Sequence, residues 1–151
     1  MRRAFFTFIV LFLSANIFGQ SISTPEELFK QYVVFGDNFD IKVAELYSDE
    51  AKIFAYRKYP HGLERVMELT GKQWKNLIVK VMPGAKAAND ISTYTEVQID
   101  GIKGGYKIRA NRYSERKCYL DKGYYMIVKP DENGNLQITE EYSETQPQAN
   151  C

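Results

Sequence analysis

Three polar residues in the C-terminal half continue predicted strand faces that carry apolar residues. Glu140 and Tyr142 lie on the same predicted strand face as Leu136 and Ile138, and Arg112 continues the apolar face of its own strand. If both faces point inward, an acid, a phenol and a guanidinium line the mouth of one pocket, where a carboxylate could accept a proton. The alternative is a cross-strand ion pair between Arg112 and Glu140 on a partly exposed rim, which would contribute little to the stability of the fold.

Two tyrosines in the N-terminal half are further candidates for the lining of a pocket. Tyr32 lies on a predicted helix and Tyr56 on a predicted strand. Buried tyrosines more often fill a core and donate one hydrogen bond than bind a ligand, so both interpretations stay open. The residue pattern assigns no catalytic role.

The single histidine, His61, lies in the turn Pro60-His61-Gly62. It could serve as a general base at a pocket entrance, although a histidine beside proline and glycine is more often simply exposed. With one histidine and no CxxC motif the chain has no metal-ligand spacing, and we expect no metal and no other cofactor.

Basic residues gather at Arg57-Lys58 and again at Arg109, Arg112 and Arg116-Lys117. These clusters could meet an anionic group. A charge run is usually a solvated face, however, and nearby acids such as Glu64 weaken its field.

The composition indicates one globular domain. The chain has 151 residues, of which 44% are hydrophobic and 26% charged, and its formal net charge is +1. These values are unlike those of disordered chains, and the small net charge excludes a nucleic-acid binder that depends on bulk positive charge.

The N-terminus has the pattern of a secretory signal peptide. Met1-Arg2-Arg3 precedes an apolar run from Ala4 to Leu13, which is shorter than the ~20 residues that span a bilayer. We expect cleavage after Gly19, a domain at 20–144 and a polar tail at 145–151. The protein would then be periplasmic or secreted and not anchored to the membrane. The alternatives are a membrane anchor or a buried helix.

Export would expose the two cysteines to an oxidising compartment. Cys118 and Cys151 could then form one intramolecular disulfide. Because Cys151 ends a polar tail, where order is usually poor, two unpaired thiols are the alternative.

Two helix starts are visible in the sequence. Thr24 can cap a helix over 25–35, and Glu27 completes a capping box. Thr70 can cap a second helix, whose apolar residues recur at helical spacing until Pro83-Gly84 ends it.

Elsewhere the pattern predicts mainly strands. Thr93, Thr95, Val97 and Ile99 alternate and should share one face. The remaining predictions are a short helix at 41–47, a strand at 51–59, and a strand at 63–69, where a helical turn is the alternative. An antiparallel meander of four strands follows at 92–99, 106–110, 118–129 (broken near Gly123) and 136–142.

Helices followed by a meander form an α+β layout in which a curved antiparallel sheet buries one face against the N-terminal helices. The chain resembles the NTF2-like superfamily, the cone fold of nuclear transport factor 2, ketosteroid isomerase and SnoaL-type cyclases. The motifs that carry the resemblance are Thr24-Pro25-Glu26-Glu27, the passage from Ala44 to Ala51, Thr70-Gly71-Lys72, and the passage from Asp131 to Ile138. Many members carry tryptophan where Leu136 stands here.

The resemblance implies two classes of function. The first is a non-catalytic domain that binds a small ligand or a protein partner in its cone or on its sheet, and this is the class we favour. The second is a pocket enzyme of the isomerase or cyclase type with a carboxylate as general base. An apolar cone with a desolvated carboxylate near a tyrosine would favour the enzyme. The resemblance also implies a homodimer formed through the sheet.

Overall fold

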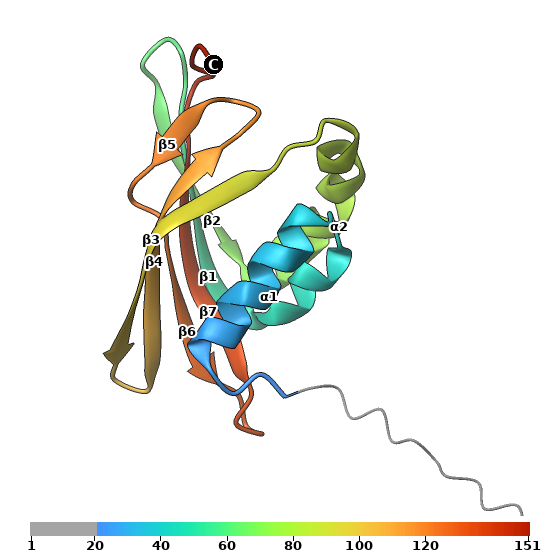
Figure 1. Ribbon diagram of the computed structural model, residues 1–151, viewed down its shortest axis with the longest axis vertical. Helices are drawn as coiled ribbons and strands as arrows, with labels where there is room; N and C mark the ends of the chain where they lie inside the picture. Colours follow the sequence, from blue (N-terminus) through green and yellow to red (C-terminus); the bar gives the residue numbers. More distant parts are fainter. Residues whose placement is uncertain (1–20) are drawn as a thin grey trace, which may run out of the picture.

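One curved sheet of seven strands carries all the helices on one of its faces (Figure 1). The computed structural model describes residues 21–151, so the predicted signal peptide at 1–19 lies outside the described residues. This two-layer arrangement confirms the predicted α+β cone, because an amphipathic helix and a half-buried sheet can each bury an apolar face only against the other.

The first layer begins with α1 (Pro25–Asp37) and η1 (Ile41–Leu46). As predicted, the Thr24 side chain caps α1 by accepting a hydrogen bond from the Glu27 N–H at 3.2 Å. The helix continues two residues beyond the predicted end at Phe35. The short second helix is a 3-10 helix, capped by Asp40.

The second long helix, α2 (Gly71–Ala87), starts with the predicted cap at Thr70, which forms a capping box with Gln73. The prediction that Pro83-Gly84 ends it is wrong, because Pro83 lies inside the helix. Pro83 and Val79 are exposed, so water can bind the carbonyl that loses its N–H donor. At its start the helix nearly touches the sheet: a Cβ added to Gly71 would lie 1.8 Å from the Ser48 carbonyl oxygen.

The strands lie in the order β2-β1-β7-β6-β4-β3, and β5 pairs with β4. The wholly antiparallel sheet of the prediction is wrong at one place, because β1 runs parallel to β7. The predicted break near Gly123 is confirmed, since β5 and β6 are separate strands. The bounds are β1 (Tyr47–Lys58), β2 (Glu64–Thr70), β3 (Ser92–Ile102), β4 (Gly105–Ser114), β5 (Tyr119–Asp121), β6 (Tyr125–Pro130) and β7 (Leu136–Thr145).

Two irregularities reverse the alternation of side chains along strands. In β7, Ile138 pairs with Val128 and Glu140 pairs with Ile127, so Thr139 is an extra residue. In β3 the register shifts between Thr95 and Gln98. A bulge of this kind turns every later side chain to the opposite face of the sheet.

Because of the bulge in β3, the prediction that Thr93, Thr95, Val97 and Ile99 share one face is wrong. Tyr94 and Ile99 pack against the core, whereas Thr93, Thr95 and Val97 are exposed. The prediction assumed an uninterrupted alternation, and an extra residue breaks it.

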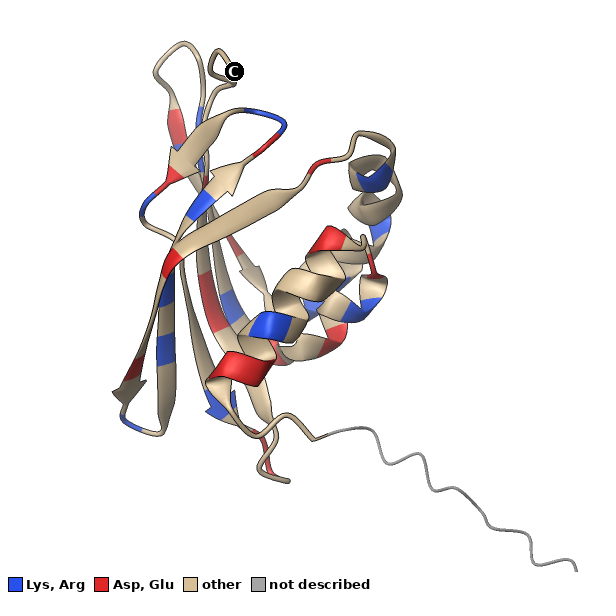
Figure 2. Cartoon of the chain, viewed as in Figure 1, with Lys and Arg blue, Asp and Glu red and all other residues tan. Residues whose placement is uncertain are grey.

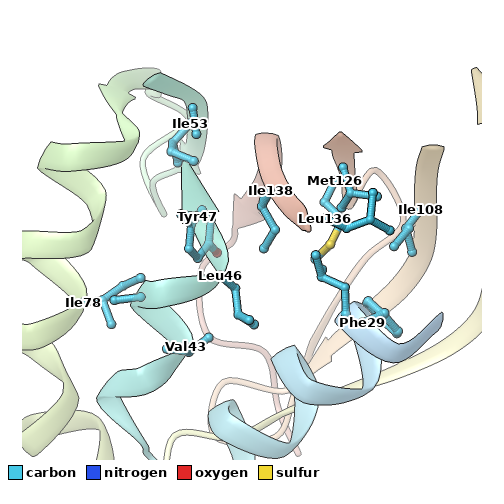
Figure 3. Close-up of a cluster of buried hydrophobic side chains, with 14 of the residues drawn as sticks. Phe29, Val43, Leu46, Tyr47, Ile53, Ile78, Ile108, Met126, Leu136 and Ile138 are labelled. Atoms are coloured by element: carbon cyan, nitrogen blue, oxygen red, sulfur yellow. The ribbon is translucent and has the colours of Figure 1, made fainter. Parts of the chain in front are cut away.

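The core lies between the helices and the concave face of the sheet (Figure 3). Phe29 of α1 and Ile78 of α2 approach it from one side, and Ile108, Met126 and Ile138 from the strands opposite. Burial of each such side chain stabilises the fold by about 1.5–3 kcal/mol. Figure 2 shows that Lys and Arg residues, as well as Asp and Glu residues, occur on both the helices and the strands.

Candidate binding site

A cavity of about 260 Å³ lies between α1, η1, α2 and β3, and we call it the helix cavity. Aromatic side chains form one part of its wall and aliphatic side chains of α2 another. Its lining includes Tyr32, Tyr47, Trp74, Ile78, Ala85 and Tyr94. The volume lies just below the range of about 300–1,000 Å³ that ligand pockets usually have, and the mainly apolar lining is typical of sites for small organic molecules.

The buried carboxylate of Glu141, a residue that is 2% exposed, lies behind the aromatic wall. One of its oxygens, Oε1, accepts hydrogen bonds from the hydroxyls of Tyr32 and Tyr124, each at 2.9 Å. The other, Oε2, accepts from the Tyr47 hydroxyl at 2.5 Å. We call these four residues the tyrosine–carboxylate cluster.

Burial controls the protonation of this cluster. It raises the pKa of Glu141, and the hydrogen bonds from the tyrosines offset only part of that rise. Burial, followed by the charge of Glu141, raises the pKa of Tyr47 and Tyr124 well above the ordinary value. The tyrosines therefore keep their protons and direct them toward Glu141, away from the helix cavity.

Among the predicted site residues, only Tyr32 belongs to this cluster. The prediction that Glu140 points inward with Ile138 is wrong, because the extra residue Thr139 turns Glu140 to the outer face and Glu141 to the inner one. On the outer face, Glu140 accepts a hydrogen bond from the Tyr125 hydroxyl at 2.8 Å.

Arg112 does point to the concave side, but its partners differ from the predicted one. Its Nη2 donates to the Glu144 carbonyl oxygen at 2.5 Å and lies 3.4 Å from Asp121 Oδ2. The same carboxylate oxygen accepts the Glu144 N–H at 2.7 Å. Arg112 and Asp121 thus bond to the backbone of Glu144, near the C-terminal end of β7, as a neighbouring strand would. The predicted ion pair between Arg112 and Glu140 does not form.

Tyr56 and Tyr142 lie outside the cone. Their rings stack on the outer face with centroids 6.4 Å apart, and Tyr142 stacks on Tyr125 at 5.8 Å. The Tyr56 hydroxyl donates to Glu64. The prediction that both tyrosines line the pocket is wrong for Tyr142 because of the bulge, and wrong for Tyr56 because Ile53 turns the opposite face of β1 inward.

His61 is exposed in the loop between β1 and β2, with its ring 5.7 Å from that of Tyr59. Residues 21–151 contain no group of three or more His, Cys, Asp or Glu side chains placed to hold a metal ion. No helix in the same range is long and apolar enough to cross a membrane.

The sulfurs of Cys118 and Cys151 are bonded, with their Cα atoms 5.3 Å apart. The C-terminal tail lies beside this bond, since the Ala149 N–H donates to the Lys117 carbonyl at 2.9 Å. The disulfide therefore ties the tail to the turn before β5.

The residue pattern did not identify Glu141, Tyr47 and Tyr124 of the tyrosine–carboxylate cluster, or Trp74 of the helix cavity. The pair Glu140-Glu141 signals that one of the two carboxylates faces inward, but not which one. Trp74 is recognisable as part of an apolar helical stripe, a pattern that a core residue and a cavity-lining residue share.

No protein-family model matches the chain. No curated protein matches it either. Solved structures do resemble it over most of its length. An NTF2-like protein of unknown function from Shewanella oneidensis has a TM-score of 0.57 at 13% identity, over 80% of this chain and 95% of that chain.

Two further structures agree with this one. A candidate ketosteroid isomerase from Parabacteroides distasonis has a TM-score of 0.54 at 15% identity, over 79% of this chain and 83% of that chain. An NTF2-like protein of unknown function from Pseudomonas putida has a TM-score of 0.55 at 11% identity, over 78% and 80%. Similarity at these identities carries the fold and not the activity. The chain therefore has the cone-shaped α+β fold of the NTF2-like superfamily, as its motifs predict.

Proposed function

We propose that this domain binds a small, largely apolar molecule in the helix cavity. The observation that carries the proposal is the open cavity itself, in which Tyr32, Trp74 and Tyr94 face the aliphatic side chains of α2 and most of the exposed surface is apolar. A ligand that removes this surface from water gains about 25 cal/mol per Å² of apolar area.

The alternative, a pocket enzyme of the isomerase or cyclase type, has one feature in its favour, because Glu141 is a desolvated carboxylate beside tyrosines. A general base must reach the proton that it removes. Glu141 does not line the helix cavity, and both of its oxygens already accept tyrosine hydroxyls. A structural role for the cluster, as one wall of a binding cavity, accounts for this arrangement.

A fluorescent probe tests the proposal. N-phenyl-1-naphthylamine is neutral, becomes bright in apolar sites and accepts energy from tryptophan. Trp74 is the only tryptophan in the chain, so energy transfer from it would locate bound probe near the helix cavity. We expect saturable binding with energy transfer.

A matched pair of variants controls for binding elsewhere. Ala85 lines the helix cavity, whereas Ala87 is exposed on the same helix. Ala85→Phe should abolish probe binding and Ala87→Phe should leave it unchanged. Equal binding by both variants, with circular dichroism showing that both are folded, would exclude the helix cavity as the site.

We also propose that the protein is exported and acts as a homodimer. The basic start and apolar run support export, and N-terminal mass spectrometry of protein from its native host should find Gln20 first. Exposed apolar residues on the edge strand β3, Val97 at 42% and Ile102 at 38%, support association at that edge. Light scattering that gives a monomer mass at micromolar concentration would contradict the dimer.

A further inference from the structure

A second hollow, which we call the arginine cleft, is lined mainly by residues of the arm that β1 and β2 form. Its volume is about 510 Å³, and its lining includes Arg57, Arg65, Met67, Ser143 and Thr145. We propose that this cleft binds the acidic group of an organic anion whose apolar body occupies the helix cavity. The inference rests on the proposed function and narrows its ligand class.

Strand register brings the two arginines together. Arg57 of β1 pairs directly with Arg65 of β2, so both side chains lie on one face of the sheet. Ile53 is buried in the core and shares the face of Arg57, which identifies that face as the concave one.

In the described part of the chain, the positive charges of Arg57 and Arg65 are not balanced by neighbouring acidic side chains. Like charges directly opposite each other in an antiparallel pair destabilise the sheet. Within residues 21–151 neither guanidinium has an ion-pair partner, and Arg57 lies 4.9 Å from the centroid of the Tyr59 ring.

The convex face of the same arm is different. There Lys58 lies 3.0 Å from a Glu144 carboxylate oxygen, and Glu64 accepts the Tyr56 hydroxyl. Positive charge is therefore balanced on the outer face of the arm and left unbalanced on the concave face. An anion in the cleft would supply the missing counter-charge to both arginines.

The two hollows are adjacent, because Trp74 lines both the helix cavity and the arginine cleft. Ser143 and Thr145 add hydroxyl groups to the cleft. An anion in the cleft would meet two guanidinium groups and these hydroxyls, while the apolar part of the same molecule continues past Trp74 into the helix cavity.

Two probes that share one body test this inference. 8-Anilino-1-naphthalenesulfonate is N-phenyl-1-naphthylamine with a sulfonate added, so the two differ only in the anionic group. We expect Arg57→Gln and Arg65→Gln each to weaken binding of the sulfonate probe about three- to tenfold and to change binding of the neutral probe less than twofold. Arg65→Lys keeps the charge and should retain most of the affinity.

Arg109→Gln is the matched control, since it removes the same charge from an exposed position on β4 where Asp100 is the partner. It should leave both affinities unchanged. The thermal midpoint of Arg65→Gln should equal or exceed that of the wild type, because the substitution removes a repulsion.

The outcomes separate the two proposals. If both probes bind but the variants at Arg57 and Arg65 do not affect the sulfonate probe, or Arg109→Gln weakens it equally, the anion site is wrong and the apolar cavity stands. If Ala85→Phe does not expel either probe, or neither probe binds the wild type, both proposals fail.

Discussion

Replacing Glu141 by leucine removes the acceptor of three tyrosine hydroxyls at once. Each hydrogen bond to a charged group contributes about 1.5–3 kcal/mol to stability. Relief from burying a carboxylate offsets several kcal/mol of that sum. Tyr32 is half-buried and lines the helix cavity, so its hydroxyl can turn to water, whereas Tyr47 at 2% and Tyr124 at 1% exposure keep unpaired hydroxyls. We expect Glu141→Leu to lower the free energy of unfolding by about 2–4 kcal/mol.

A double-mutant cycle with Tyr124 isolates the buried pair. Tyr124→Phe alone should cost about 1.5–3 kcal/mol, because it removes a donor to a buried charge. In the Glu141→Leu background the same change should cost almost nothing, since it removes the unpaired hydroxyl. The expected coupling is therefore about 1.5–3 kcal/mol, measured by urea unfolding of the four proteins.

The adjacent residues Tyr125 and Glu140 provide the matched control. Tyr125 donates to Glu140 in the same way, at 2.8 Å, but on the outer face, where both are half-exposed. The coupling of Tyr125→Phe with Glu140→Leu should stay below about 1 kcal/mol, because water competes for both groups. A coupling at Tyr124 and Glu141 no larger than this control would refute the argument that burial makes the cluster strong.

Three further predictions concern the same fold. Burial raises the pKa of Glu141 above its ordinary 4.5, so the folded state holds this proton more tightly than the unfolded state does. The stability of the wild type relative to Glu141→Gln should therefore be greatest below pH 4.5 and should fall as the pH rises through the folded pKa. Urea titrations from pH 4 to pH 8 measure this difference, and a rise with pH would contradict it. The Cys118–Cys151 disulfide closes a sequence separation of 33 residues, so Cys151→Ser or reduction should cost about 2–4 kcal/mol; identical unfolding curves with and without dithiothreitol would show that the bond does not form. Arg112→Met leaves the fully buried Asp121 without its cation and should cost about 3 kcal/mol, part of which Asp121→Asn should restore; thermal unfolding of the single and double variants tests this, and additive losses would contradict it.

Local chemistry made much of the fold predictable. The caps at Thr24 and Thr70 involve residues within one helical turn, so the sequence pattern identifies both helix starts correctly. The break near Gly123 is equally local. Pro83 misled the prediction, because the cost of a proline inside a helix depends on whether its surroundings are exposed.

The inward face of β7 was not predictable in the same way. Strand alternation correctly places Ile138 in the core, and the single extra residue Thr139 then exchanges the roles of Glu140 and Glu141. Neither acid differs from the other in type or neighbours enough to signal the bulge. The partner strand decides the register, and that partner is distant in sequence.

Periodicity and capping act over a few residues, so the sequence pattern predicts the types and order of the elements, the capped helices and the cone fold. The tertiary structure alone decided which side chains meet. Tyr32 of α1, Tyr47 of β1 and Tyr124, which immediately precedes β6, share one carboxylate only after the sheet curves over the helices. The facing of Arg57 and Arg65 likewise depends on the register between two strands, a long-range pairing that no local pattern encodes.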